Sequence, residues 1–142
     1  MKKSMKWFAL VLLLSVGFVS CKKDDDSATP SSSTSITQGK WRVTLYNDSG
    51  NDETNHFSGY EFTFSSGGSV TASKSGAATV TGTWSTGFDD SQNKLYLTFT
   101  TNNDFIEITD DWHILQQTSA KIQLEDVSGG NGGTDLLTFE KI

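Results

Sequence analysis

The sequence predicts an all-β domain over residues 36–142, an eight-stranded antiparallel up-and-down β-barrel. Three observations favour this fold class. Apolar and polar residues alternate with a period of two through most of the region. Gly, Asn and Asp cluster between the alternating segments. The single proline, Pro30, precedes the region and so interrupts no strand. A closed barrel leaves no open sheet edge, and a two-sheet β-sandwich is the alternative.

Eight short segments carry the alternation, and each is expected to form one strand. The first places Trp41, Val43 and Leu45 on the inner face, and the others follow at turns rich in Gly, Ser, Asn and Asp. The segments are 41–46, 60–65, 70–72, 78–84, 95–99, 112 to a turn at 118–119, 121–125 and 137–139.

One short segment between the fifth and sixth strands has a helical signal. Asp104 and Glu107 have the spacing of a capping box, which predicts a single helical turn reaching Thr109. A bulged entry into the next strand is the competing interpretation.

The N-terminus has the three parts of an export signal. Three lysines precede a 13-residue apolar run, 7–19, which is shorter than the roughly 20 residues that span a bilayer. Residues 1–20 are therefore interpreted as a signal peptide. The sequence Phe18-Val19-Ser20-Cys21 resembles the bacterial lipobox, with Phe18 where that motif usually has Leu. The resemblance implies that Cys21, the only cysteine, is diacylated and anchors the chain to a membrane.

Residues 21–35 are expected to form the lipidated start and a disordered tether, because they contain no large apolar side chain. Lys22, Lys23, Asp24, Asp25 and Asp26 resemble the export signal that directs lipoproteins of Bacteroidota to the outer face of the outer membrane. A lipoprotein facing the periplasm, with these charges acting only as a solvated tether, is the alternative.

The charge of the chain limits its partners. The formal net charge is −6, and removing the three lysines of the signal peptide makes it −9. Such an acidic protein is not expected to bind nucleic acid or to bind a membrane electrostatically. The lipid at Cys21 is therefore the expected membrane contact, and protein partners are not indicated.

Several short motifs resemble the lipocalin-like domains of Bacteroidota lipoproteins. The resemblance covers residues 39–141 and implies an eight-stranded barrel in the cell envelope, without an established ligand. The motifs are Gly39-Lys40-Trp41-Arg42-Val43, Gly59-Tyr60-Glu61-Phe62-Thr63-Phe64, Gly82-Thr83-Trp84, Asp111-Trp112 with Ile114, and Leu137-Thr138-Phe139-Glu140-Lys141.

The aromatic residues of the alternating segments are the candidate ligand contacts. An eight-stranded barrel is just wide enough to be filled by side chains or to hold one small ligand. The leading hypothesis is a non-enzymatic binding module for a small apolar or amphiphilic molecule. The alternative is an envelope-structural or protein-interaction module with a filled barrel. The candidate contacts are Trp41, Tyr60, Phe62, Trp84, Phe99 and Trp112.

No catalytic, metal or cofactor site is predicted. His56 and His113 lack the HxH or HxxxH spacing of zinc sites and are expected to be ordinary surface or edge residues. No GxSxG nucleophile motif is present. The acidic stretches 48–53, 89–90 and 110–111 lack the EF-hand spacing and are interpreted as turn formers, and the Gly-rich stretch 129–133 as a hairpin tip.

Overall fold

The computed structural model describes residues 36–101, 103–128 and 133–142. The predicted signal peptide, Cys21, the export signal and the tether lie outside these residues, as do residues 129–132 of the Gly-rich stretch. Within the described part of the chain, no helix has the length and apolar character needed to cross a membrane.

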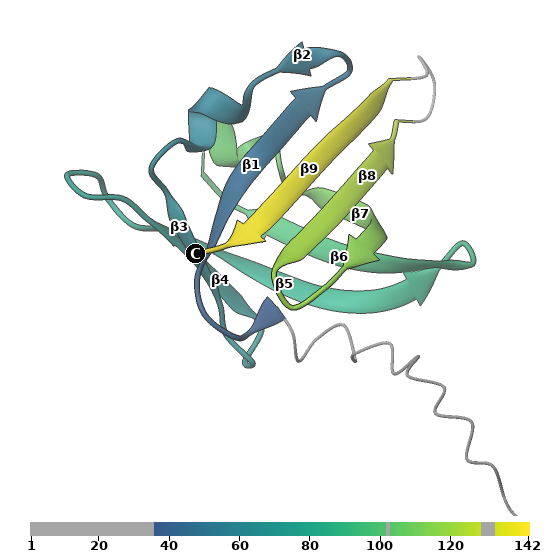
Figure 1. Ribbon diagram of the computed structural model, residues 1–142, viewed down its shortest axis with the longest axis horizontal. Helices are drawn as coiled ribbons and strands as arrows, with labels where there is room; N and C mark the ends of the chain where they lie inside the picture. The colour runs from purple at the N-terminus through teal and green to yellow at the C-terminus, as the bar shows by residue number, and fades with distance from the viewer. Residues whose placement is uncertain (1–35, 102, 129–132) are drawn as a thin grey trace, which may run out of the picture.

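One antiparallel sheet closes on itself to form a barrel (Figure 1). Strands β3 to β9 pair in sequence order. β1 pairs with β3 on one edge and with β9 on the other, so eight strands close the barrel. The two-residue β2 pairs only with the end of β1. The predicted closed barrel is confirmed, and the sandwich alternative is excluded. The strands are β1 (Trp41–Asp48), β2 (Asn51–Asp52), β3 (Glu61–Phe64), β4 (Ser69–Ser73), β5 (Val80–Asp89), β6 (Gln92–Phe99), β7 (Asp110–Gln117), β8 (Lys121–Val127) and β9 (Thr134–Lys141).

The hairpin between β5 and β6 is longer than the alternation predicts. β5 runs to Asp89 and β6 begins at Gln92, so most of the residues between the predicted strands 78–84 and 95–99 belong to strands. Asp90 and Ser91 form the turn with φ values of 48° and 63°. Two successive left-handed residues are typical of a tight type I′ hairpin. Because such turns usually contain glycine, the Asp-Ser pair concealed the strand ends.

The alternation expected for β1 is wrong after Val43, because this strand contains a bulge. The register against β9 shifts between Val43 and Leu45. Beyond the shift Tyr46, not Leu45, points into the core and is 2% exposed. An extra residue in one strand reverses the faces of all residues after it, and this explains the difference.

Two short 3-10 helices lie between strands. η2 (Asp104–Ile106) confirms the predicted turn, but its cap is Asn103, whose side-chain oxygen accepts a hydrogen bond from the backbone N–H of Phe105. The expected Asp104 capping box is therefore one residue out of register. η1 (Thr54–Phe57) was not indicated by any sequence pattern.

Aromatic rings from both 3-10 helices enter the barrel. Phe57 of η1 and Phe105 of η2 are each 1% exposed, and their ring centroids lie 5.4 Å apart in an edge-to-face arrangement. Phe105 also packs against Phe62 and Phe99, at centroid distances of 5.8 Å and 5.2 Å. Phe62 in turn contacts Phe139 at 5.2 Å. This chain of ring contacts extends across the interior from η2 to β9.

The buried tryptophans have satisfied indole groups. Trp41 donates its Nε1–H to the carbonyl of Ile36 at 2.8 Å, and Trp112 donates to the carbonyl of Ile108 at 3.1 Å. Among the described residues, no buried side-chain nitrogen or oxygen lacks a hydrogen-bond partner. These side chains are therefore stably placed as parts of the core.

Truncating Phe105 should destabilise the barrel strongly. Phe105→Ala removes a buried ring with several aromatic neighbours, and we expect the free energy of unfolding to fall by about 3–5 kcal/mol. Urea denaturation would measure the loss. Phe88→Ala is the matched control, because Phe88 is 72% exposed and should change stability by less than about 0.5 kcal/mol. Equal losses in the two variants would contradict this account of the core.

Candidate functional site

A concavity among the described residues lies on the flank of the barrel, where β1 and β3 diverge. β1 matches β9 at six register positions but matches β3 at one, Trp41 opposite Phe62. Figure 1 shows the two strands meeting near the C-terminus and separating from there. η1 lies beside the separating strands, and the space left open forms what we call the flank cavity.

The flank cavity has a volume of about 530 Å³ and opens to solvent. This volume lies within the range of about 300–1,000 Å³ that is typical of small-molecule sites. Its walls come from β1, from η1 with the segment that follows it, and from the C-terminal residue. The lining residues are Arg42, Val43, Thr44, Thr54, Asn55, Phe57, Ser58, Gly59, Tyr60, Glu61 and Ile142.

Hydrogen bonds to β1 hold η1 over this opening. The backbone N–H of Tyr46 donates to Oγ1 of Thr54 at 2.8 Å, and the N–H of Glu53 donates to the carbonyl of Tyr46 at 2.9 Å. These bonds take the place of a ladder to β3 at this position of β1. Gly59 continues the loop with a φ of +80°, a left-handed conformation that favours glycine.

The cavity combines an apolar floor with a charged rim. Phe57 is continuous with the core, and Tyr60 packs edge-to-face on Phe105 with a centroid distance of 5.0 Å. At the rim, Glu61 is ion-paired with Lys40. The Arg42 side chain forms no hydrogen bond or ion pair with another residue of the described ranges. Among the described residues, the rim therefore offers the Arg42 cation without a partner, beside apolar surface.

The six aromatic candidates for ligand contact fall into two groups, one in the flank cavity and one in the packed core. Tyr60 alone lines the flank cavity. The other five lie in the packed core, with exposed fractions of 0–8%: Trp41, Phe62, Trp84, Phe99 and Trp112. The alternation identified their inward face but gave no signal for Arg42, Phe57 or Ile142, which line the cavity.

A smaller cavity of about 220 Å³ lies on the outer face of β6, β7 and β8. Lys94 is 9% exposed there, and its Nζ donates to the carbonyl of Asp111 at 3.2 Å and lies 3.5 Å from a carboxylate oxygen of Asp111. His113 lies with its Nδ1 3.9 Å from an oxygen of Glu125. The cation is already neutralised by its neighbour, so this cavity offers less to an anionic ligand than the flank cavity does.

The two histidines are not isolated surface residues. His113 lines the smaller cavity, and His56 lies in η1 with its Nδ1 3.0 Å from a carboxylate oxygen of Glu107. The hydrogen bond with Glu107 raises the pKa of His56 above its ordinary value. Each histidine thus has a carboxylate partner, which no local sequence spacing indicated.

Carboxylates also gather around the phenol of Tyr46. Burial, and then the negative charges of Asp48 and Asp135, raise the pKa of Tyr46 well above its usual range. The phenolic O–H donates to the carbonyl of Glu107 at 3.0 Å. Tyr46 therefore remains a neutral hydrogen-bond donor that ties β1 to the segment after η2.

A closed up-and-down barrel of eight antiparallel strands is a lipocalin-like architecture. The chain is similar to the crystal structure of a DUF4847 family protein from Bacteroides vulgatus, with a TM-score of 0.50 and 18% identity over 75% of this chain and 94% of that one. It is also similar to a lipocalin-like protein from Bacteroides uniformis, with a TM-score of 0.49 and 18% identity over 76% of this chain and 99% of that one. At this identity the first likeness shows the fold alone. No protein-family model and no curated protein matches the chain.

Asp110 provides a pH test of the electrostatics at the start of β7. Partial burial is the largest cause that raises the pKa of Asp110 above its ordinary value of 3.8, and the negative charge of Asp126 raises it further. A hydrogen bond from the backbone N–H of Asp111 lowers the pKa and offsets part of this rise. A carboxyl with a raised pKa in the folded state destabilises the fold when ionised, and the penalty disappears as the pH falls below the unfolded value. Asp110→Asn should therefore raise the urea midpoint at pH 7, and the gain should shrink as the pH falls and vanish below about pH 3.8.

The Asp110→Asn variant keeps the local hydrogen bond, because its side-chain amide still offers an oxygen to the backbone N–H of Asp111. Asp111→Asn is the control, because it weakens the ion pair with Lys94 and should not stabilise the protein. A lower midpoint for Asp110→Asn than for the unmodified protein at pH 7 would contradict the predicted sign.

Proposed function

We propose that the protein is a lipid-anchored binding module that holds one small amphiphilic molecule in the flank cavity. The observation that carries the proposal is the Arg42 cation, which pairs with no other residue that the structure describes and lies beside an apolar wall that includes Phe57 and Tyr60. An anionic head group would pair with Arg42 while an apolar body covers the rings. The ligand class is therefore an amphiphile with a carboxylate, sulfonate or similar anion.

The filled interior supports a site on the flank instead of the barrel axis. The contacts of Phe57, Phe62, Phe105 and Phe139 occupy the interior that a larger barrel would leave for a ligand. The β1–β3 seam is the place where the ladder is thinnest. A ligand there would contact the core without displacing it.

A non-enzymatic role fits the lining of the flank cavity. Among the described residues, its lining includes no histidine or cysteine, and its one acidic side chain, Glu61, is paired with Lys40. Nucleophilic catalysis needs a nucleophile activated by an adjacent base. The cavity groups support binding better than they support such chemistry.

The membrane anchor and the surface location form the second part of the proposal, and they rest on the sequence. Cys21 follows a signal-type apolar run, and Asp24, Asp25 and Asp26 follow two lysines. Two or more acyl chains hold a protein on a membrane far more strongly than one. We infer an outer-membrane lipoprotein exposed at the cell surface, with a periplasm-facing orientation as the alternative.

The alternative function is an envelope-structural or protein-interaction module without a small ligand. The filled interior favours it, and exposed apolar side chains such as Phe88 and Val127 offer surface for a protein partner. This alternative predicts that the flank cavity binds no amphiphile.

Binding of the fluorescent probe 1-anilinonaphthalene-8-sulfonate tests the proposal, because the probe joins an anion to an apolar ring system. We expect saturable binding at one site, followed by fluorescence titration. Arg42→Gln should weaken it by about 2–5-fold, the value of one exposed ion pair. Ser58→Trp should abolish it, because Ser58 is an exposed residue of the cavity wall and the larger side chain would fill the opening.

Lys121→Gln is the matched control, since it removes a cation from outside the cavity lining and should leave probe affinity unchanged. Urea midpoints of all variants would exclude binding by partly unfolded protein. If the probe does not saturate, or if Ser58→Trp binds it as well as the unmodified protein, the envelope-structural alternative is favoured.

Two variants separate anchoring from surface export. Cys21→Ser should abolish acyl labelling and release the protein from the membrane fraction, because it removes the lipid attachment point. Replacing Asp24, Asp25 and Asp26 by Ala should keep acylation but remove cleavage by protease added to intact cells. Unchanged cleavage in the triple variant would refute the export signal, and acylated Cys21→Ser protein would refute the anchor.

A further inference from the structure

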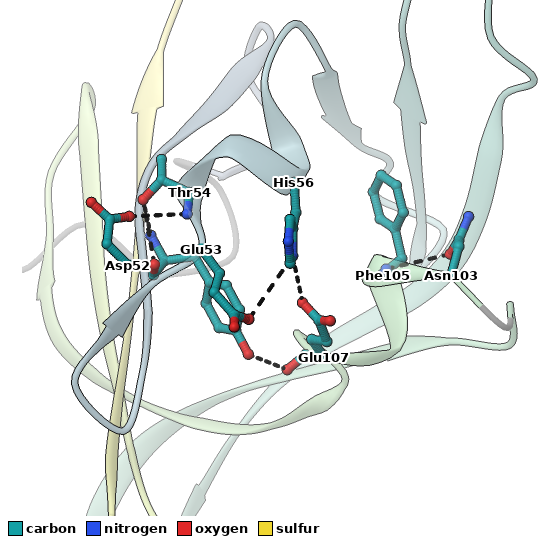
Figure 2. Close-up of polar contacts among 8 residues, drawn as sticks. Asp52, Glu53, Thr54, His56, Asn103, Phe105 and Glu107 are labelled. Carbon is teal, nitrogen blue, oxygen red and sulfur yellow. Dashed lines mark hydrogen bonds and ion pairs between the residues drawn. The ribbon is translucent and has the colours of Figure 1, made fainter.

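η1 and the segment after η2 bring three metal-ligating side chains together outside the flank cavity. Glu53, His56 and Glu107 each present one ligand atom, and these atoms lie within 4.8 Å of one another. Nδ1 of His56 is 3.0 Å from Oε2 of Glu107 and 3.9 Å from Oε2 of Glu53. Figure 2 shows the imidazole pointing toward both carboxylates. We call this group the Glu-His-Glu cluster.

The cluster has more carboxylates than basic groups. In the described part of the chain, neither Glu53 nor Glu107 forms an ion pair with a lysine or arginine, and His56 is the only basic partner of both. Asp104 adds further negative charge nearby. One imidazole shared by two carboxylates leaves excess negative charge even when the imidazole is protonated. A divalent cation would neutralise both carboxylates at once.

The spacing fits a small tetrahedral ion. Zinc binds nitrogen and carboxylate oxygen at about 2.0–2.2 Å, so two ligands of a tetrahedral site lie about 3.4 Å apart. The observed distances of 3.0 Å and 3.9 Å fall on either side of this value. Adjustments of about 0.5 Å in half-exposed side chains would bring the ligands into place. Calcium, by contrast, takes six to eight oxygen ligands, and three groups with one imidazole do not suit it.

Tyr46 holds the two glutamates in position through their backbones. Its carbonyl accepts the N–H of Glu53 at 2.9 Å, and its phenol donates to the carbonyl of Glu107 at 3.0 Å. The segments that carry Glu53 and Glu107 thus both bond to the buried residue Tyr46, one to its backbone and one to its phenol. Such support reduces the reorganisation that metal binding would require.

We propose that Glu53, His56 and Glu107 form a binding site for one divalent ion of the zinc type, with a fourth position open to water. The ion would join η1 to the segment after η2. It would thereby restrain the two 3-10 helices whose phenylalanines pack inside the barrel. A second acidic group, Asp110 with Asp111 and Asp126, does not carry the same inference. It has no imidazole, and Asp111 already pairs with Lys94.

Isothermal titration of the full chain, purified in detergent without a histidine tag, tests the site with zinc chloride. We expect one Zn²⁺ per chain and no comparable binding of Ca²⁺ or Mg²⁺. His56→Ala and Glu107→Gln should each weaken Zn²⁺ binding by at least about 10-fold. His113→Ala is the matched control, because it removes the other histidine, which also lies beside a glutamate. Its affinity should stay within about twofold.

A second readout follows the imidazole directly. Zn²⁺ should shift the ¹⁵N resonance of the His56 ring and leave that of the His113 ring unchanged. Glu53→Gln provides a further variant if His56→Ala lowers the thermal midpoint of the protein. Absence of Zn²⁺ binding, equal binding of Ca²⁺, or equal loss in His113→Ala would each overturn the proposal and leave the cluster as an ion pair alone.

Discussion

The edge-to-face contact between Phe57 and Phe105 is the interaction on which the rest of the structure depends. Neither residue belongs to a barrel strand; each is delivered by a 3-10 helix in a connection between strands. Their rings extend the aromatic packing of Phe62, Phe99 and Phe139, and this fills the interior. Each buried ring contributes both apolar area and a favourable ring geometry. A barrel of this size that is filled by its own connections must bind any ligand elsewhere.

The same packing explains why β1 and β3 pair at only one position. η1 must lie close to Phe105 for its phenylalanine to enter the core. The Thr54 side chain and the backbone N–H of the preceding Glu53 then bond to the backbone of Tyr46. β3 follows η1 by a short loop through Gly59, so it meets β1 only at the Trp41–Phe62 position. On its other edge, β1 pairs with β9 at six positions, Trp41 included. The flank cavity is therefore a consequence of the position that η1 takes when its phenylalanine fills the interior.

The strands could be predicted from sequence because a half-buried strand exposes one face, and exposure leaves a period-two pattern. The pattern failed where a local geometry had no compositional signal. The bulge in β1 exchanged Leu45 for Tyr46 in the core, and the Asp90–Ser91 turn hid two strand ends. Alternation also identifies an inward face without showing whether that space is filled, so five of the six aromatic candidates proved to be core. The pairing of His56 with Glu107 depends on tertiary closure, which no local spacing encodes.

Because the cavity is separate from the core, most of the residues that would contact a ligand can change without affecting the fold. Where a ligand occupies the interior, the residues that contact it also hold the strands together, and a change of ligand risks the fold. Here the cavity rim consists largely of exposed or half-exposed side chains, such as Arg42, Ser58 and Ile142, while Val43 and Phe57 join the cavity floor to the core. Substitutions at exposed positions usually cost little stability. The rim can therefore change its charge and shape while the aromatic interior stays the same.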